Sequence, residues 1–98
     1  MRTMMKVSIP VEAGNKAIND GSLPKIMGSL LERLKPEAAY FGTEHGKRTA
    51  FIVFDFTDVT DMPSIAEPLF MGLNADVTYL PVMNATDLQS GLKKLASR

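Results

Sequence analysis

The sequence predicts an α+β fold in a single domain spanning residues 1–98. Three observations favour it. Apolar residues recur at helical spacing in two segments, each flanked by strand-like segments. The segment 50–54 is apolar at every position, which is typical of a strand buried on both faces. The two halves of the chain also share a helix start and a tyrosine in the following strand. We therefore expect the order β-α-β-β-α-β and then a tail helix at about 85–96.

The first half of the chain begins with a strand expected over residues 4–11, where apolar and more polar residues alternate. A short helix over residues 13–20 follows, and Gly21 can end it because glycine tolerates a left-handed backbone. A second helical piece is expected to start at Ser22 as its cap, with Pro24 in the first turn. One apolar face then runs through Leu23, Ile26, Met27, Leu30, Leu31 and Leu34.

A β-hairpin is expected in the middle of the chain. Residues 38–44 form its first strand, and residues 44–47 have the composition of a turn. The second strand, over residues 48–57, is the strongest in the sequence because β-branched and aromatic residues dominate it.

The second half repeats the pattern of the first. Asp61 is expected to cap a helix with Pro63 near its start. A fourth strand is expected over residues 76–83, and Asn84 or Thr86 can cap the tail helix. The apolar positions are Met62, Ile65, Ala66, Leu69, Phe70 and Leu73 in the first of these helices, and Leu88, Leu92 and Leu95 in the tail helix.

The internal repeat supports one arrangement of these elements. When the halves are aligned, the shared positions are Ser22 with Asp61, Pro24 with Pro63, and Tyr40 with Tyr79. Two copies of a strand–helix–strand unit give a ferredoxin-like fold. Its antiparallel sheet has the strand order 4-1-3-2, and both helices lie on one face.

The strongest strand implies that the other face of the sheet is also covered. If Ile52 faces the helices, then Phe51 and Val53 face outward, where Tyr40 and Met4 can join them. A second copy of the sheet is the simplest cover, so we expect a homodimer through this open face. The alternative is that the tail helix folds back over the same face.

Three stretches of sequence resemble a known group of proteins. They are KPEAAYF at residues 35–41, AEPLF at 66–70 and YLPVM at 79–83. With the order of elements, they resemble small bacterial proteins of the dimeric α+β barrel superfamily that have no assigned activity. The resemblance implies two ferredoxin-like sheets that enclose a lumen. That superfamily includes cofactor-free monooxygenases, isomerases, haem-degrading enzymes and ligand-binding modules, and no catalytic motif of these can be placed on this chain.

The composition excludes several classes of function. The chain has no cysteine and one histidine, so a thiolate zinc site, a cysteine nucleophile and a multi-histidine metal centre are excluded. Eleven basic residues balance eleven acidic ones, which argues against nucleic-acid and membrane partners. No nucleotide fingerprint is present, and we expect no cofactor. No signal peptide or membrane-spanning run is present, so a cytoplasmic location is expected.

The candidate ligand-binding residues lie mainly on the predicted open face. A register with Pro10 opposite Phe51 places Lys6 opposite Asp55, with Ser8 on the same face. This charge pair could bind a polar ligand or support proton transfer. The alternative is a structural ion pair.

Three further candidates have structural alternatives. Tyr40 could donate a hydrogen bond to a ligand, or it could belong to the core. Glu67 beside Pro68 could line a pocket opening, or it could be exposed. His45 lies in the predicted turn, where an exposed position is the simplest explanation.

The sequence therefore supports more than one function. The first hypothesis is a homodimeric protein that binds or transforms a small organic molecule in the lumen, with or without enzymatic activity. The second is a non-catalytic structural or interaction module with a filled core. A third is an RNA-recognition motif, because residues 47–54 match part of its aromatic pattern, but Thr49 stands where a stacking aromatic is needed.

Overall fold

The structure is a computed structural model, and it describes residues 1–97 of the chain. Within this range the chain forms four strands, four α-helices and one 3₁₀ turn. They are β1 (Arg2–Ile9), α1 (Val11–Asn19), α2 (Ser22–Leu34), β2 (Ala38–Glu44), β3 (Lys47–Asp55), the turn η1 (Val59–Asp61), α3 (Met62–Leu73), β4 (Asp76–Pro81) and α4 (Ala85–Ala96).

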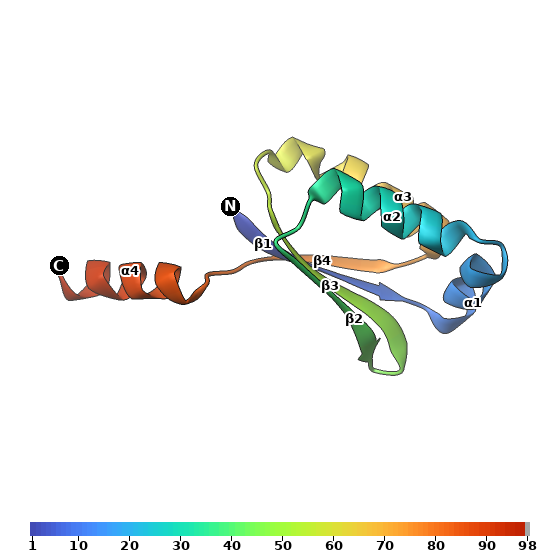
Figure 1. The fold of residues 1–98 in the computed structure, drawn as a ribbon, viewed down its shortest axis with the longest axis horizontal. Coiled ribbons are helices and arrows are strands. Elements are labelled where there is room, and N and C mark those ends of the chain that lie inside the picture. The colour runs from blue at the N-terminus through green and yellow to red at the C-terminus, as the bar shows by residue number, and fades with distance from the viewer. Residues whose placement is uncertain (98) are drawn as a thin grey trace.

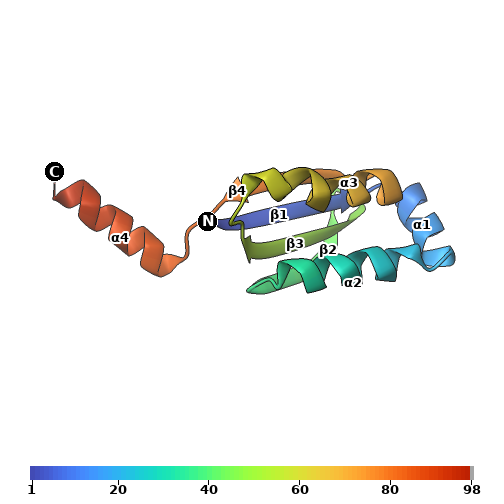
Figure 2. The same cartoon turned by 90° about the horizontal axis from the view of Figure 1, so that it is seen from above.

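The strands form one antiparallel sheet in the order β2-β3-β1-β4. Read from the opposite edge, this is the strand order expected from the sequence. The helices α2 and α3 lie over the same side of the sheet, and α1 lies at its end (Figure 1). The view from above shows α2 and α3 as two separate helices that run roughly along the direction of the strands (Figure 2). The fold is therefore α+β with one covered sheet face.

The helix starts differ from the predicted caps. Gly21 has a left-handed backbone, with φ of 79°, and separates α1 from α2 as expected. Ser22 is the first residue of α2 and not its cap, because Gly21 occupies the N-cap position; the Ser22 N–H donates to the Asp20 carboxylate at 2.8 Å. Asp61 occupies the predicted N-cap position of α3, but its side chain makes no capping hydrogen bond. The side chain of Asp58 caps the preceding turn η1 instead.

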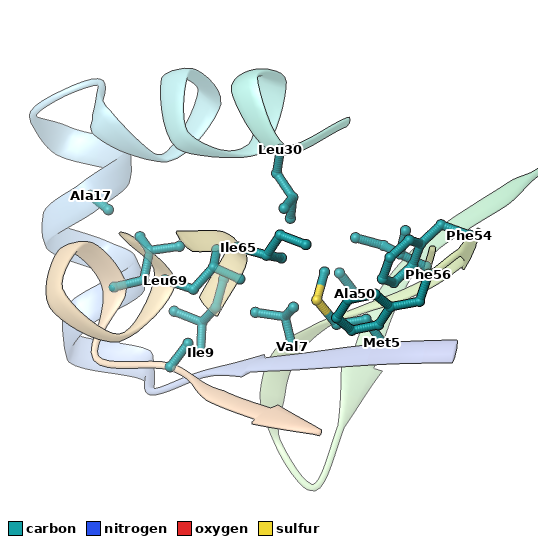
Figure 3. Packing of buried hydrophobic residues seen from close by; sticks show 13 residues of the cluster. Met5, Val7, Ile9, Ala17, Leu30, Ala50, Phe54, Phe56, Ile65 and Leu69 are labelled. Atoms are coloured by element: carbon teal, nitrogen blue, oxygen red, sulfur yellow. The ribbon is translucent and has the colours of Figure 1, made fainter. Parts of the chain in front are cut away.

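The core lies between the helices and one face of the sheet (Figure 3). β1 and β3 supply its centre, and Met5 lies directly opposite Ile52, both fully buried. The buried apolar residues of β1 are Met5, Val7 and Ile9, those of β3 are Ala50, Ile52 and Phe54, and Phe56 follows them. Thr3 on β1 and Thr49 on β3 are buried as well. The alternation predicted for the first strand is confirmed. In β3, which was predicted to be apolar on both faces, Ile52 and Phe54 are buried and Phe51 and Val53 are half-buried.

The two helical stripes are buried to different extents. In α3, four stripe residues are buried, whereas Met62 and Phe70 at its margins are exposed. In α2, Leu30 alone is buried, and the other stripe residues pack around the core with part of their surface exposed. The helix α2 therefore covers the rim of the core, and α3 covers its centre.

The two tyrosines aligned by the repeat face opposite sides of the sheet. Tyr79 lies opposite Met5 and packs against the core, with its ring 5.4 Å from that of Phe56. Tyr40 lies opposite Phe51 on the face without helices. The observed order is β-α-α-β-β-α-β-α, so the first half of the chain has one helix more than the predicted repeat unit. The positions of Tyr40 and Tyr79, which the repeat aligned, are not equivalent in the structure.

The tail helix α4 does not fold back over the sheet. It extends away from the body as a separate arm (Figure 1), and none of its residues is buried. Asn84 caps it, as one of the two predicted alternatives, in a capping box with Asp87. The alternative cover for the open face, the chain's own tail, is therefore not observed.

No helix in residues 1–97 combines the length and the apolar character needed to cross a bilayer.

Candidate functional site

The face of the sheet without helices has an apolar centre. Met4 lies between Val53 on β3 and Leu80 on β4, and Phe51 lies opposite Tyr40 on β2. Tyr40 and Leu80 are 69% and 55% exposed. We call these five residues the open-face patch. The prediction that Phe51 and Val53 point away from the helices is confirmed.

A polar depression adjoins this patch toward the β2–β3 turn. It encloses about 230 Å³ and draws side chains from all four strands and the turn. The residues that line it are Lys6, Ser8, Glu44, His45, Lys47, Asp76 and Thr78. The strand register explains this grouping, because Lys6 lies opposite Thr78 and Ser8 lies opposite Asp76. We call this depression the polar site.

Lys6 connects the polar site to the apolar patch. Its ammonium forms an ion pair with Glu44 and lies 6.0 Å from the centre of the Phe51 ring. The hydrogen bond from Lys6 is the main reason that the pKa of Glu44 lies below its ordinary value, and the charges of Lys6 and His45 lower it further. Burial opposes the shift. Glu44 is therefore held as a carboxylate, which suits it to position Lys6 and not to donate a proton.

His45 is held at the site by a tight turn. His45 and Gly46 have φ of 54° and 75°, which is the left-handed pair of a two-residue type I′ hairpin. Glu44 and Lys47 close the turn opposite each other. The predicted hairpin is confirmed, and the turn places an imidazole beside two lysines and two carboxylates.

The predicted pairing of Lys6 with Asp55 is wrong. Lys6 lies opposite Phe51, and Asp55 lies opposite Arg2 at the far end of β3. There the Asp55 carboxylate accepts a hydrogen bond from the Met1 ammonium at 2.7 Å. The physical reason is register: alternation fixes which face a strand residue occupies, but not which residue lies opposite.

The other predicted site residues are divided between two faces. Lys6 and Ser8 line the polar site, and Tyr40 belongs to the open-face patch beside it. Glu67 lies exposed on α3, among the helices that cover the opposite face, and the polar site does not include it.

Four residues of the polar site were missed by the sequence analysis. They are Glu44, Lys47, Asp76 and Thr78. The turn composition was the available signal for the first two, since a two-residue turn places its flanking residues opposite each other. Asp76 and Thr78 could only be placed once the β1–β4 register was known.

A second cavity lies between α2 and α3. It encloses about 300 Å³, and apolar side chains such as Ile26, Ile65 and Pro68 form much of its lining. At its rim the Arg33 guanidinium donates to the Ser64 hydroxyl at 2.6 Å. No carboxylate or imidazole lines it. The polar site is therefore the better candidate for chemistry.

No group of three or more potential metal ligands lies together in residues 1–97. Compared with known proteins, the chain matches no protein-family model and no curated protein.

Proposed function

We propose that this protein is a homodimeric, ferredoxin-like α+β barrel that binds or transforms a small organic molecule between its two sheets. The strand order and the helices on one face support the ferredoxin-like arrangement. The open-face patch, in which Tyr40 and Leu80 are exposed and the other three residues are half-buried, supports pairing through the other face, because an apolar central strand is stable only when both faces are covered.

One observation carries the proposal: Lys6 belongs to the polar site and also lies over Phe51 in the apolar patch. A second sheet over this face would exclude water from Lys6 and strengthen its attraction to an anionic group. The same ligand would rest its apolar part on Phe51 and Met4. We therefore infer a ligand with one acidic group and an apolar, preferably aromatic, body.

The remaining side chains of the polar site suit the orientation of such a ligand. The hydroxyls of Ser8 and Thr78 can each donate one hydrogen bond and accept others. Lys47 adds a second positive charge at the rim. An imidazole such as that of His45 is the side-chain type most often used for proton transfer, if the ligand is transformed as well as bound.

The fluorescent anion 1-anilinonaphthalene-8-sulfonate (ANS) is a suitable probe, since it joins a sulfonate to two aromatic groups. We expect saturable ANS binding to the native dimer. Lys6→Met should weaken this binding by about tenfold or more, because a hydrogen bond to a charged group contributes about 1.5–3 kcal/mol. Near-UV circular dichroism must stay native, since loosely packed states also bind ANS.

Lys25→Met is the matched control, because Lys25 lines the cavity between α2 and α3. ANS binding that is lost in Lys25→Met and kept in Lys6→Met would place the ligand between the helices and reject the open-face site. A native dimer that binds no ANS would favour the second hypothesis, a structural module with a filled core.

A further inference from the structure

The arm α4 carries an apolar stripe that its own chain leaves uncovered. Leu88, Leu92 and Leu95 recur at helical spacing and are 48%, 54% and 57% exposed. An isolated helix of 12 residues is marginal in water, even with good caps. A helix of this length is therefore expected to pack against another surface.

The start of the arm is fixed in a direction that leads away from its own sheet. The Val82 N–H donates to the Arg2 carbonyl at 3.1 Å. The Arg2 guanidinium binds both Glu37, at 2.5 Å, and Asp87 in the first turn of α4. Only Met83 separates Val82 from the cap Asn84. The connection is therefore too short for α4 to turn back and place its stripe on the open face of its own sheet.

The stripe follows on from the open-face patch. Leu80 belongs to that patch, and Met83, which is 64% exposed, lies between Leu80 and the arm. The uncovered apolar side chains thus continue along the chain from the sheet into α4. A single partner that covers the patch is placed to cover the stripe as well.

The area needed for a stable dimer points the same way. With strands of six to nine residues, the sheet face measures about 500 Å², at about 4.8 Å between strands and 3.3 Å per residue. Standard interfaces bury about 800 Å² on each partner. A helix of this length presents about 200 Å² on one side. With exchanged arms, each copy would also bury one side of its own arm and the surface that the partner's arm covers. Together with the sheet face, these areas reach the size of a standard interface.

We propose that α4 is an exchange arm that docks through Leu88, Leu92 and Leu95 on a second copy of this chain, with the second copy's arm docking in return. This inference rests on the proposed pairing of the open faces and goes beyond it, because the tail then belongs to the partner's interface. It also makes the arm part of whatever encloses the proposed lumen.

A photo-crosslinker tests the assignment on the full chain. We would place p-benzoylphenylalanine at position 92 and co-refold ¹⁵N-labelled with unlabelled chains. The expected products after irradiation are crosslinked peptides that join one labelled to one unlabelled chain. The control is the same probe at Ser90, which lies on the opposite side of α4 from the stripe and should give little crosslinking.

A substitution gives an independent measurement. The triple variant Leu88→Gln, Leu92→Gln and Leu95→Gln should raise the dimer dissociation constant by about 1,000-fold or more, since each of the three buried leucines is expected to contribute about tenfold. Far-UV circular dichroism should show the sheet and α1 to α3 unchanged. The control Ser90→Gln should keep the wild-type dissociation constant.

Several results would overturn the exchange arm. Crosslinks confined to single chains would show that the arm folds onto its own body. A dimer unaffected by the triple variant would show that the stripe has no role in pairing. A monomer that sediments with phosphatidylglycerol vesicles through the stripe would make a membrane surface the occupant. A failure of ANS binding in an arm-exchanged dimer would reject only the proposed ligand site.

Discussion

Lys6 and Glu44 form an ion pair that reaches across β3, because Lys6 lies on β1 and Glu44 ends β2. These two strands are not neighbours in the sheet. Both side chains line the polar site, and together they span β3. The pair fixes the position of the one ammonium that lies both in the polar site and over Phe51.

The Lys6–Glu44 pair predicts a dependence of stability on pH. The pKa of Glu44 lies below its ordinary value of 4.5 in the folded protein, mainly because of the hydrogen bond from Lys6. The unfolded chain therefore binds the proton more readily. The stability that the carboxylate contributes is present above pH 4.5 and is lost as the pH falls through its lower folded pKa.

Urea unfolding between neutral and acidic pH measures this contribution. Wild type should lose stability more steeply below pH 4.5 than Glu44→Gln. Asp20 and Asp58, whose pKa values are also lowered by hydrogen bonds from Ser22 and Thr60, remain in both proteins and cancel in the comparison. Superimposable pH profiles would show that the pair is broken in solution.

Val53→Lys is predicted to dissociate the proposed dimer without unfolding the domain. Val53 lies between Ala38 and Met4 in the apolar centre of the open face, and a lysine there would lose its hydration in a paired sheet. Analytical ultracentrifugation should show a particle near the chain mass of 10.7 kDa, against about twice that for wild type.

The matched control for Val53→Lys is Ile18→Lys. Ile18 is a 49% exposed aliphatic residue on α1, away from the open face. The substitution Ile18→Lys should leave the proposed dimer intact. Wild-type protein that sediments as a monomer at micromolar concentration would contradict the proposed pairing.

Much of the fold was predictable because local patterns determine it. Alternation in β1 and β3 assigned Met5 and Ile52 to one face and Phe51 to the other, and the structure agrees. The hairpin followed from His45 and Gly46, since few sequences adopt two successive left-handed residues. The strand order was predicted from the internal repeat, because two strand–helix–strand units give the order 4-1-3-2.

The candidate site was predicted only in part, because register is a non-local property. The expected match of Lys6 with Asp55 preserved the correct face but shifted the pairing along the strands. Nothing in either strand alone favours one even-numbered shift over another, since each keeps apolar residues on the same side. The direction of α4 was likewise unpredictable, because it depends on the contacts of Arg2 with Glu37 and Asp87.

Two glycines of the α1–α2 region should respond to alanine with opposite signs. Gly28 lies inside α2, and a Cβ there would meet no atom within 4 Å. Gly28→Ala should therefore raise the free energy of unfolding by about 0.5–1 kcal/mol, because alanine has the higher helix propensity. Gly21 has a φ of 79°, so Gly21→Ala should lower it by about 1–2 kcal/mol.

Both values are measured by urea unfolding monitored by circular dichroism. The two variants control for each other, because each replaces a glycine by alanine in or next to α2. A difference in sign therefore reports the backbone conformation and not the added methyl group. Equal effects of the same sign would mean that Gly21 does not hold a left-handed backbone in solution.

His45 can be separated into its role in the turn and its role in the polar site. With φ of 54°, His45 occupies a left-handed position that asparagine accepts and a β-branched residue does not. His45→Asn should keep the stability of the hairpin, whereas His45→Val should lower the free energy of unfolding by about 1–2 kcal/mol. If the imidazole takes part in binding, ANS affinity should fall in His45→Asn although its stability is unchanged. Affinity that falls only in His45→Val would instead show that the histidine serves the turn, and that the lysines of the polar site provide the charge that holds an anionic ligand.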